Sequence, residues 1–203
     1  MVTVGVTGTM GSGKTTLCKE WERLGAVVVY ADPLAKELMQ KDSRIIDQIQ
    51  RSFGEKAYLP DGSLDREYLS RIAFQSGRAD ELNNIVHPVV CEEIQRRMHL
   101  ARARGAEMFV EEAALLLLNG RPDGFDVIVL VRSGQKKQLS RVQQRDGLSE
   151  KEFLARIDRQ PSEKEMEQLA DYLVENRSGL SDFRKEAESL YRILVSKGRE
   201  FKS

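Results

Sequence analysis

A glycine-rich segment near the N-terminus has residue types and spacing suited to phosphate chemistry. Residues 8–15 read Gly-Thr-Met-Gly-Ser-Gly-Lys-Thr and match the pattern G-x-x-x-x-G-K-[ST]. In this pattern backbone N–H groups and a helix N-terminus surround the phosphates, the lysine bridges the outer phosphates, and the final hydroxyl binds Mg²⁺. The segment therefore predicts a nucleoside triphosphate site, with Thr15 on the metal, that is formed by Gly11, Ser12, Gly13, Lys14, Thr15 and Thr16.

The elements around this segment are those that a phosphate-binding loop needs. Val2–Val6 reads as a buried strand before the loop, and Thr15–Leu24 reads as a helix after it. A second strand follows at once, which makes a βαβ unit. The expected strands are Val2–Val6, Ala26–Tyr30, Met108–Val110, Val127–Val131 and Tyr172–Val174. Strands separated by helices predict an α/β fold: a P-loop core with a five-stranded, parallel, doubly wound sheet.

Two long stretches between these strands carry helical patterns. Residues 33–105 show apolar residues at i,i+4, as at Ile45, Ile49 and Phe53, and residues 134–167 are strongly charged. We expect a helical substrate-binding insertion and a helical lid on a core of residues 1–32, 106–133 and 168–203. This layout is typical of small-molecule kinases, in which one insertion holds the acceptor and the other closes over the phosphates. The Asn-Lys-x-Asp element by which GTPases read guanine is missing from the sequence.

Composition narrows the class of protein further. The 203 residues include 32 Lys+Arg and 32 Asp+Glu, so the formal net charge is zero. A nucleic-acid binder would carry a basic excess and a membrane-surface protein a basic amphipathic stripe, so neither partner is expected. Two cysteines and two histidines are too few for a disulfide framework or a recognisable zinc site, which favours a reducing cytoplasm. The oligomeric state stays open.

Several segments together resemble the dephospho-coenzyme A kinase family. They cover nearly the whole chain in the family's order: residues 5–16, Ala31–Ala35, Phe53–Gly54, Asp61–Arg66, Leu82–Pro88, Gln138–Asp146, Arg156–Gln160 and Ala170–Asn176. The resemblance implies transfer of the γ-phosphate of ATP, with Mg²⁺, to the ribose 3′-hydroxyl of dephospho-CoA. It also implies a P-loop core with a helical CoA-binding domain and a lid.

The resemblance assigns roles to particular residues. Asp32 follows the second strand and becomes the candidate base that accepts the hydroxyl proton, although Asp before Pro33 could instead cap a helix. Arg141 and Arg145 become lid arginines that meet the triphosphate, and a solvated basic face is the alternative. Because the run Arg132–Arg145 contains no acidic residue, we expect its positive charges to be unpaired. The remaining candidates are Asn176 for the nucleotide and Arg66, Asn83 and His87 for the acceptor pocket. His87 could also be a structural residue where a helix starts before Pro88.

The sequence departs from the family pattern after the third strand and late in the lid. Ala114–Leu118 stands where the family usually has Pro-Leu-Leu-Phe-Glu, and Met166 stands where it usually has a basic residue. Glu111 and Glu112 lie just before the first departure, and the sequence does not decide which of them serves the metal or the acceptor. Two alternatives stay open: a P-loop kinase of another nucleotide or nucleoside, and a degenerate nucleotide-binding regulator. The missing proline and glutamate support only the second of these.

Overall fold

The computed structural model describes residues 1–75, 77–177 and 179–200, apart from the side chains of residues 74, 75 and 200. The chain forms two compact units. The sheet unit comprises Met1–Val29 and the chain from Leu100 onward, and the helical unit comprises Tyr30–His99.

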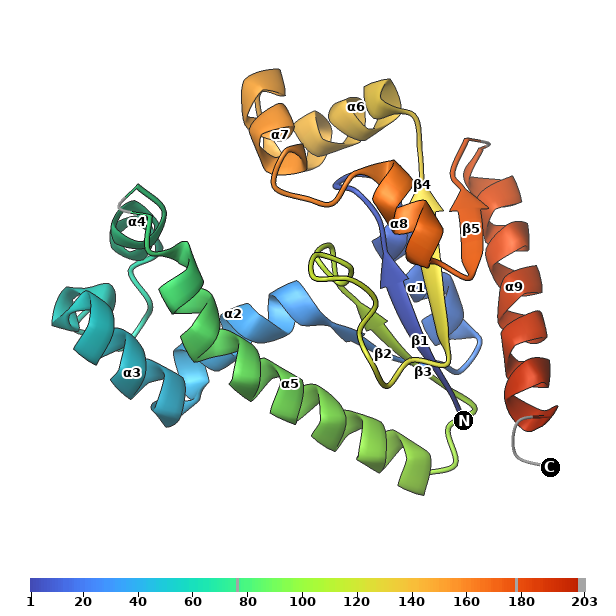
Figure 1. The fold of residues 1–203 in the computed structure, drawn as a ribbon, viewed down its shortest axis with the longest axis horizontal. Helices are drawn as coiled ribbons and strands as arrows, with labels where there is room; N and C mark the ends of the chain where they lie inside the picture. The colour runs from blue at the N-terminus through green and yellow to red at the C-terminus, as the bar shows by residue number, and fades with distance from the viewer. Residues whose placement is uncertain (76, 178, 201–203) are drawn as a thin grey trace. The chain divides into compact units, whose positions relative to one another are not determined.

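A five-stranded sheet is the framework of the sheet unit (Figure 1). Its spatial order is β2-β3-β1-β4-β5, and β1 runs parallel to both β3 and β4, as β4 does to β5. The strands are β1 (Val2–Thr7), β2 (Val27–Tyr30), β3 (Met108–Glu112), β4 (Val127–Arg132) and β5 (Tyr172–Glu175). All five lie where the sequence predicts them, and the apolar runs of β1 and β4 are buried along nearly their whole length, as in a sheet covered on both faces.

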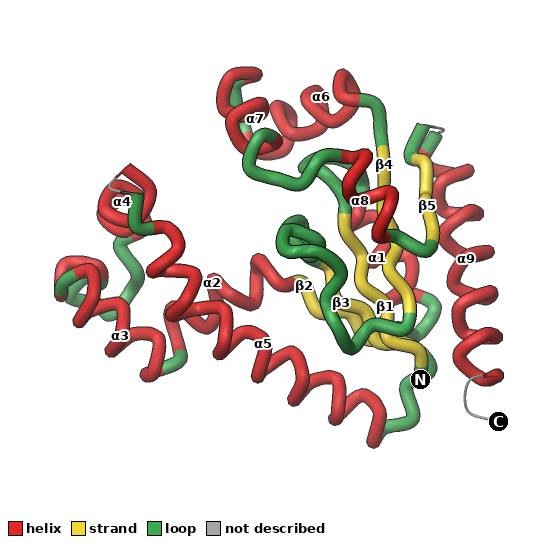
Figure 2. The backbone as a smooth tube through the Cα atoms, in the orientation of Figure 1, coloured by secondary structure: helices red, strands yellow, loops and turns green. Residues whose placement is uncertain are grey.

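Helices of the sheet unit cover both faces of the sheet (Figure 2). Met166 of α8 packs with Ile128 and Leu130 of β4 on one face. On the other face α1 packs against α9, where the indole N–H of the fully buried Trp21 donates to the Ala187 carbonyl at 2.8 Å. The helices are α1 (Lys14–Arg23), α6 (Gln135–Asp146), α7 (Glu150–Ile157), α8 (Glu163–Leu169) and α9 (Leu180–Glu200). Cys18 and Trp21 are both fully buried and are therefore packing residues.

The helical unit is built from amphipathic helices, as the i,i+4 pattern predicts. Its elements are α2 (Ala31–Lys41), α3 (Ser43–Phe53), η1 (Glu55–Ala57), α4 (Arg66–Ser70), η2 (Arg71–Gln75) and most of α5 (Ala79–Ala103). Ile45, Ile49 and Phe53 form the buried stripe of α3. The Asp65 carboxylate caps α4 by accepting from the Tyr68 N–H at 2.9 Å. Within the described ranges, none of these helices is both long and apolar enough to cross a membrane.

Two sequence-based alternatives for helix starts are wrong. The N-cap of α2 is Tyr30, so Asp32 lies inside the first turn and does not cap the helix. Similarly α5 begins at Ala79 and contains Pro88 in its interior, so His87 does not mark the start of a helix. A proline inside a helix removes one backbone hydrogen bond, and the long helix on both sides of Pro88 tolerates that loss.

Candidate active site at the phosphate-binding loop

The P-loop, residues 8–15, connects the end of β1 to the first turn of α1. Gly13 is the N-cap of α1, with φ 114°, and none of the described side chains caps this helix. A side chain at Gly13 would also strike the Asn176 amide, and one at Gly11, with φ 78°, would lie 2.7 Å from the Gln138 carbonyl oxygen. Glycine at both positions lets the loop curve closely while the first amides of α1 stay available to phosphate oxygens.

The Lys14 side chain lies folded along the P-loop. Its Nζ donates to the Gly8 carbonyl at 2.9 Å and to the Thr9 carbonyl at 3.3 Å. The same ammonium lies 3.9 Å from Oε1 of Glu112, at the end of β3. Lys14 is buried, so the loop holds a positive charge directly beside its own carbonyls. This charge is positioned to bridge phosphate oxygens.

Glu112 is the acidic residue that faces the P-loop, a choice that the sequence leaves open. Its Oε2 accepts a hydrogen bond from the Thr15 hydroxyl at 3.4 Å. Gly5 pairs in register with both Glu111 and Ile128, so Glu111 points to the opposite face, on the side of Ile128. Burial raises the pKa of Glu111 to about 7. The two neighbouring carboxylates therefore have separate environments, and only Glu112 meets Lys14 and Thr15.

Thr15 and Glu112 suit a magnesium ion by the chemistry of their donors. A hydroxyl oxygen and a carboxylate oxygen approach each other at the mouth of the loop, and Mg²⁺ prefers oxygen ligands with phosphates completing its shell. In addition, the hydroxyls of Thr9 and Ser12 are buried without a hydrogen-bond partner in the described part of the chain. The site is therefore polar and provides oxygen donors next to the phosphate-binding amides.

Asn176 and Arg141 support the P-loop from the side of β5 and α6. The Asn176 amide donates to the Ser12 carbonyl at 2.8 Å, and its oxygen accepts from Arg141 at 3.2 Å. The Arg141 guanidinium also donates to the carbonyls of Gly11 at 3.1 Å and Ser12 at 3.3 Å. The structure thus brings the predicted residues Asn176 and Arg141 together with the loop, where they hold its outer carbonyls.

Two arginines of the basic run Arg132–Arg145 form ion pairs with acidic residues. Arg132 pairs with Glu175 and Glu167, which come from other parts of the chain. Arg145 forms a bidentate ion pair with Asp146, which raises the pKa of the Arg145 guanidinium. The negative charge of Glu112 raises this pKa further. The expectation of unpaired positive charge over this run is therefore wrong at these two arginines, because acidic partners lie outside the run or at its edge.

A cavity of about 1040 Å³ borders the start of the P-loop at Thr9. Its walls come from the first turn of α6, the segment between α7 and α8, and the end of β5. Ser133, Lys136, Lys137, Gln160, Ser162 and Arg177 are among the lining residues. The lid helices therefore leave space beside the loop in the sheet unit.

The candidate acceptor residues lie in the helical unit. Asp32 is exposed in the first turn of α2, immediately after β2, and its carboxylate forms no hydrogen bond or ion pair with a described residue. Asn83 and His87 lie one turn apart on an exposed face of α5, where His87 Nδ1 is 3.5 Å from Cys91 Sγ. Arg66 is exposed at the start of α4 and has no ion-pair partner in the described part of the chain. All four side chains are accessible.

The structure explains one of the differences from the family pattern, the one at Met166. Met166 is fully buried and packs with Leu117 and Ile128, so a basic side chain there would have to enter the core. Leu118, in contrast, is half exposed. The Ala170–Asp171 segment is structural: the Asp171 carboxylate accepts from the Ile128 N–H at 2.7 Å and pairs with Arg121 at 2.9 Å.

Comparisons with known sequences give one consistent family. A family model described as Dephospho-CoA kinase matches residues 2–182. The chain is 39% identical over 192 residues to the dephospho-CoA kinase of Salinibacter ruber, which covers 94% of this chain and 96% of the relative. It is 34% identical over 180 residues to the dephospho-CoA kinase of Corynebacterium diphtheriae, with 88% and 90% covered.

Solved structures agree in fold. TT1252 from Thermus thermophilus superposes with a TM-score of 0.76 at 29% identity, covering 95% of this chain and 97% of that one. The dephospho-CoA kinase from Campylobacter jejuni gives a TM-score of 0.64 at 24% identity over 95% and 96%, which is a likeness of fold. Taken with the family match over residues 2–182, these findings show that the chain belongs to the dephospho-CoA kinase family.

Proposed function

We propose that this protein transfers the γ-phosphate of ATP to the ribose 3′-hydroxyl of dephospho-CoA, giving coenzyme A and ADP. The observation that carries the proposal is the family match over residues 2–182, because it spans the P-loop, the helical unit and the lid together. The geometry of the P-loop supports the donor half of the reaction. Transfer is direct and in line, without a covalent enzyme intermediate.

On the donor side, the P-loop amides and Lys14 bind the triphosphate. Thr15 and Glu112 would hold Mg²⁺, which supplies charge neutralisation at the phosphate oxygens when bound. Lys14 must exchange its bonds to the Gly8 and Thr9 carbonyls for bonds to phosphate oxygens. Arg145 adds positive charge from the lid, and Arg141 and Asn176 keep the loop in shape through its outer carbonyls.

On the acceptor side, Asp32 takes the proton of the attacking hydroxyl. Its carboxylate is exposed and lacks a described partner, so a substrate hydroxyl can reach it without displacing another bond. It also follows the C-terminal end of a strand, where ligands of open α/β sheets bind. Arg66, Asn83 and His87 are the proposed contacts to the rest of the acceptor; a guanidinium without an ion-pair partner suits its diphosphate.

A degenerate nucleotide-binding regulator is the weaker alternative. Its sequence support is the absence of the family's proline and glutamate at Ala114 and Leu118. Lys14, Thr15 and Glu112 lie in contact, so the groups proposed to bind the phosphates and Mg²⁺ are all present. Met166 serves the core, so its difference from the family does not remove a group from the P-loop.

Release of ADP across a panel of acceptors tests the proposal. The chain is incubated with ATP, Mg²⁺ and, separately, dephospho-CoA, nucleosides, nucleoside monophosphates and shikimate-sized alcohols, and ADP is measured with a coupled assay. We expect kcat/KM to be highest for dephospho-CoA. A higher kcat/KM for another acceptor would identify a different kinase, and ATP binding without ADP release from any acceptor would favour the regulator.

A further inference from the structure

Gln160 bonds two backbone segments that border the phosphate site. Its Oε1 accepts a hydrogen bond from the Met10 N–H at 3.0 Å, and its Nε2 donates to the Ala114 carbonyl at 3.1 Å. Met10 belongs to the P-loop that follows β1, and Ala114 follows β3, just beyond Glu112. Since β1 and β3 are neighbours in the sheet, one side-chain amide satisfies a donor and an acceptor at adjacent strand ends.

The position of Gln160 is itself fixed by the fold. Gln160 lies between α7 and α8, and its N–H donates to the Ile157 carbonyl at 2.8 Å. Two residues later the Ser162 capping box starts α8. Met166 of α8 then anchors that helix in the core beside Leu117, which lies on the same segment as Ala114. The anchored helix α8 therefore fixes the backbone of Gln160, where the chain leaves α7 and enters α8.

The two segments that Gln160 joins carry the two halves of the proposed metal and phosphate site. Lys14 and Thr15 belong to the P-loop, whereas Glu112 belongs to the end of β3. Their mutual distances of 3.4 and 3.9 Å depend on how closely the two segments approach each other. We propose that Gln160 is a positioning residue that sets this approach, and with it the placement of Glu112 against Lys14 and Thr15.

The hydrogen bond to Gln160 also occupies one backbone N–H of the P-loop. The Met10 N–H donates to Gln160, so it is not available to a phosphate oxygen while that bond lasts. Phosphate binding then rests on the later amides of the loop and on Lys14. A displacement of about 1 Å in such a site can cost on the order of a hundredfold in rate. Loss of the two Gln160 hydrogen bonds should therefore reduce turnover more than it reduces stability.

Substitution of Gln160 by methionine removes both hydrogen bonds while keeping a side chain of similar length. The matched control is Q168M, because Gln168 is exposed on α8 and has no described partner. For Q160M we expect kcat to fall roughly tenfold to a hundredfold, the Mg²⁺ concentration for half-maximal rate to rise several-fold, and the KM for dephospho-CoA to stay unchanged. Q168M should match the wild type.

Melting curves separate positioning from a merely structural role. If Q160M keeps wild-type kcat and Mg²⁺ requirement, or if its loss of rate equals its unfolded fraction at the assay temperature, the proposal is wrong. A second variant tests the two bonds separately. In Q160E the carboxylate still accepts from Met10 but cannot donate to Ala114, so its kcat should also fall. Wild-type kcat in Q160E would contradict the proposal that Gln160 must bond both segments.

This inference rests on the proposed function, and a binding measurement keeps the two distinguishable. If the wild type does not phosphorylate dephospho-CoA, the proposed function fails. The positioning role of Gln160 is then tested by the affinity for ATP, measured by titration calorimetry with and without Mg²⁺. Mg²⁺ should strengthen ATP binding less in Q160M than in Q168M. An equal effect of Mg²⁺ in both variants would contradict the positioning role whatever the acceptor.

Discussion

Asp32 is the residue whose chemistry the proposed reaction needs most on the acceptor side. D32N keeps the size of the side chain and removes its basicity. Since a positioned base contributes roughly 10²–10⁴-fold, kcat should fall by that order, while the melting temperature and the Kd for ATP stay near wild-type values. Steady-state kinetics and calorimetry check both parts. D47N, at an exposed position of α3, is the control, and near-normal kcat in D32N would refute the assignment.

Glu112 and Glu111 form a natural pair of neighbouring variants at the end of β3. E112Q removes the charge that meets Thr15 and Lys14, so more Mg²⁺ should be needed for half-maximal rate and kcat should fall roughly tenfold or more. E111Q changes the side chain on the opposite face and should leave the Mg²⁺ requirement unchanged. Rate measured against Mg²⁺ concentration distinguishes them. The reverse ranking of the two variants would place the metal on the other face.

Among the elements, β5 and α6 act on the P-loop through Asn176. N176A would remove one hydrogen bond to the Ser12 carbonyl and one from the Arg141 guanidinium, while the bond between Arg141 and Ser12 remains. Because one hydrogen bond contributes about 0.5–1.5 kcal/mol net, we expect the Kd for ATP to rise roughly threefold to tenfold and the free energy of unfolding to fall. Calorimetry and urea unfolding measure the two effects. N119A, at an exposed position, is the control; unchanged ATP affinity in N176A would mean that the loop keeps its shape without this support.

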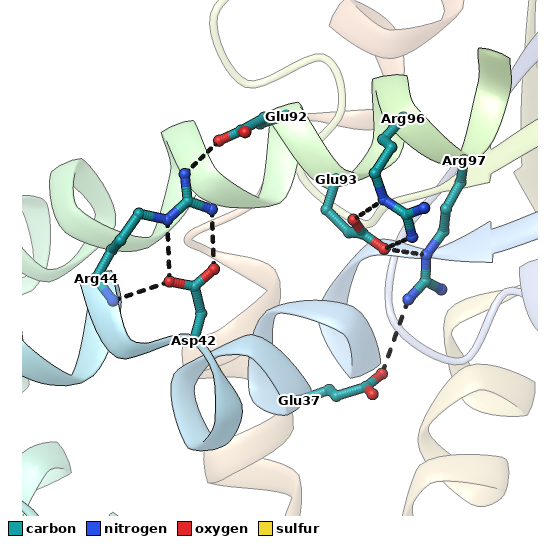
Figure 3. Close-up of polar contacts among 7 residues, drawn as sticks. All are labelled: Glu37, Asp42, Arg44, Glu92, Glu93, Arg96 and Arg97. Atoms are coloured by element: carbon teal, nitrogen blue, oxygen red, sulfur yellow. Dashed lines mark hydrogen bonds and ion pairs between the residues drawn. The ribbon is translucent and has the colours of Figure 1, made fainter. Parts of the chain in front are cut away.

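Charged side chains connect the helices of the helical unit (Figure 3). Arg44 of α3 pairs with Asp42 and with Glu92 of α5, and Glu93 binds Arg96 and Arg97. Arg97 in turn approaches Glu37 of α2 at 4.0 Å. The hydrogen bonds from Arg96 and, secondarily, Arg97 lower the pKa of Glu93 to about 2.

The sign of the pH effect follows from this lowered pKa. The carboxylate is stabilised in the folded state, so its contribution is complete above the ordinary pKa near 4.5 and disappears as pH falls toward 2. With solvent screening at the partly exposed arginines, we expect about 1 kcal/mol. Between pH 6 and pH 3 the wild type should therefore lose more unfolding free energy than E93Q does. Urea unfolding measures this, with E188Q on α9 as an exposed-pair control; equal losses in wild type and E93Q would contradict it.

The sequence predicted elements better than it predicted contacts. Short apolar runs located all five strands, and the G-x-x-x-x-G-K-[ST] pattern located the loop, because both signals are local. Glu112 could have been chosen over Glu111 only with the register of β3 against β1, since neighbouring strand residues point to opposite faces. The bonds of Arg141 and Gln160 to the P-loop join residues far apart in the chain, so no periodicity could reveal them.

At the scale of the whole molecule, the zero net charge conceals local pairing. The sequence suggested a lid with unpaired positive charge, whereas Arg132 and Arg145 both have acidic partners. Under the proposed function, positive charge for a triphosphate would come from Lys14, from the N-terminus of α1 and from guanidiniums that exchange acidic partners for phosphate oxygens.

The identity of the phosphorylated product tests the central claim most directly. The wild-type chain is incubated with ATP, Mg²⁺ and dephospho-CoA, and the acceptor is analysed by mass spectrometry before and after treatment with a 3′-nucleotidase. We expect an acceptor heavier by one phosphoryl group, one ADP per product, and loss of that group after the treatment. ADP formed without a phosphorylated acceptor, or a phosphate that the 3′-nucleotidase cannot remove, would contradict it.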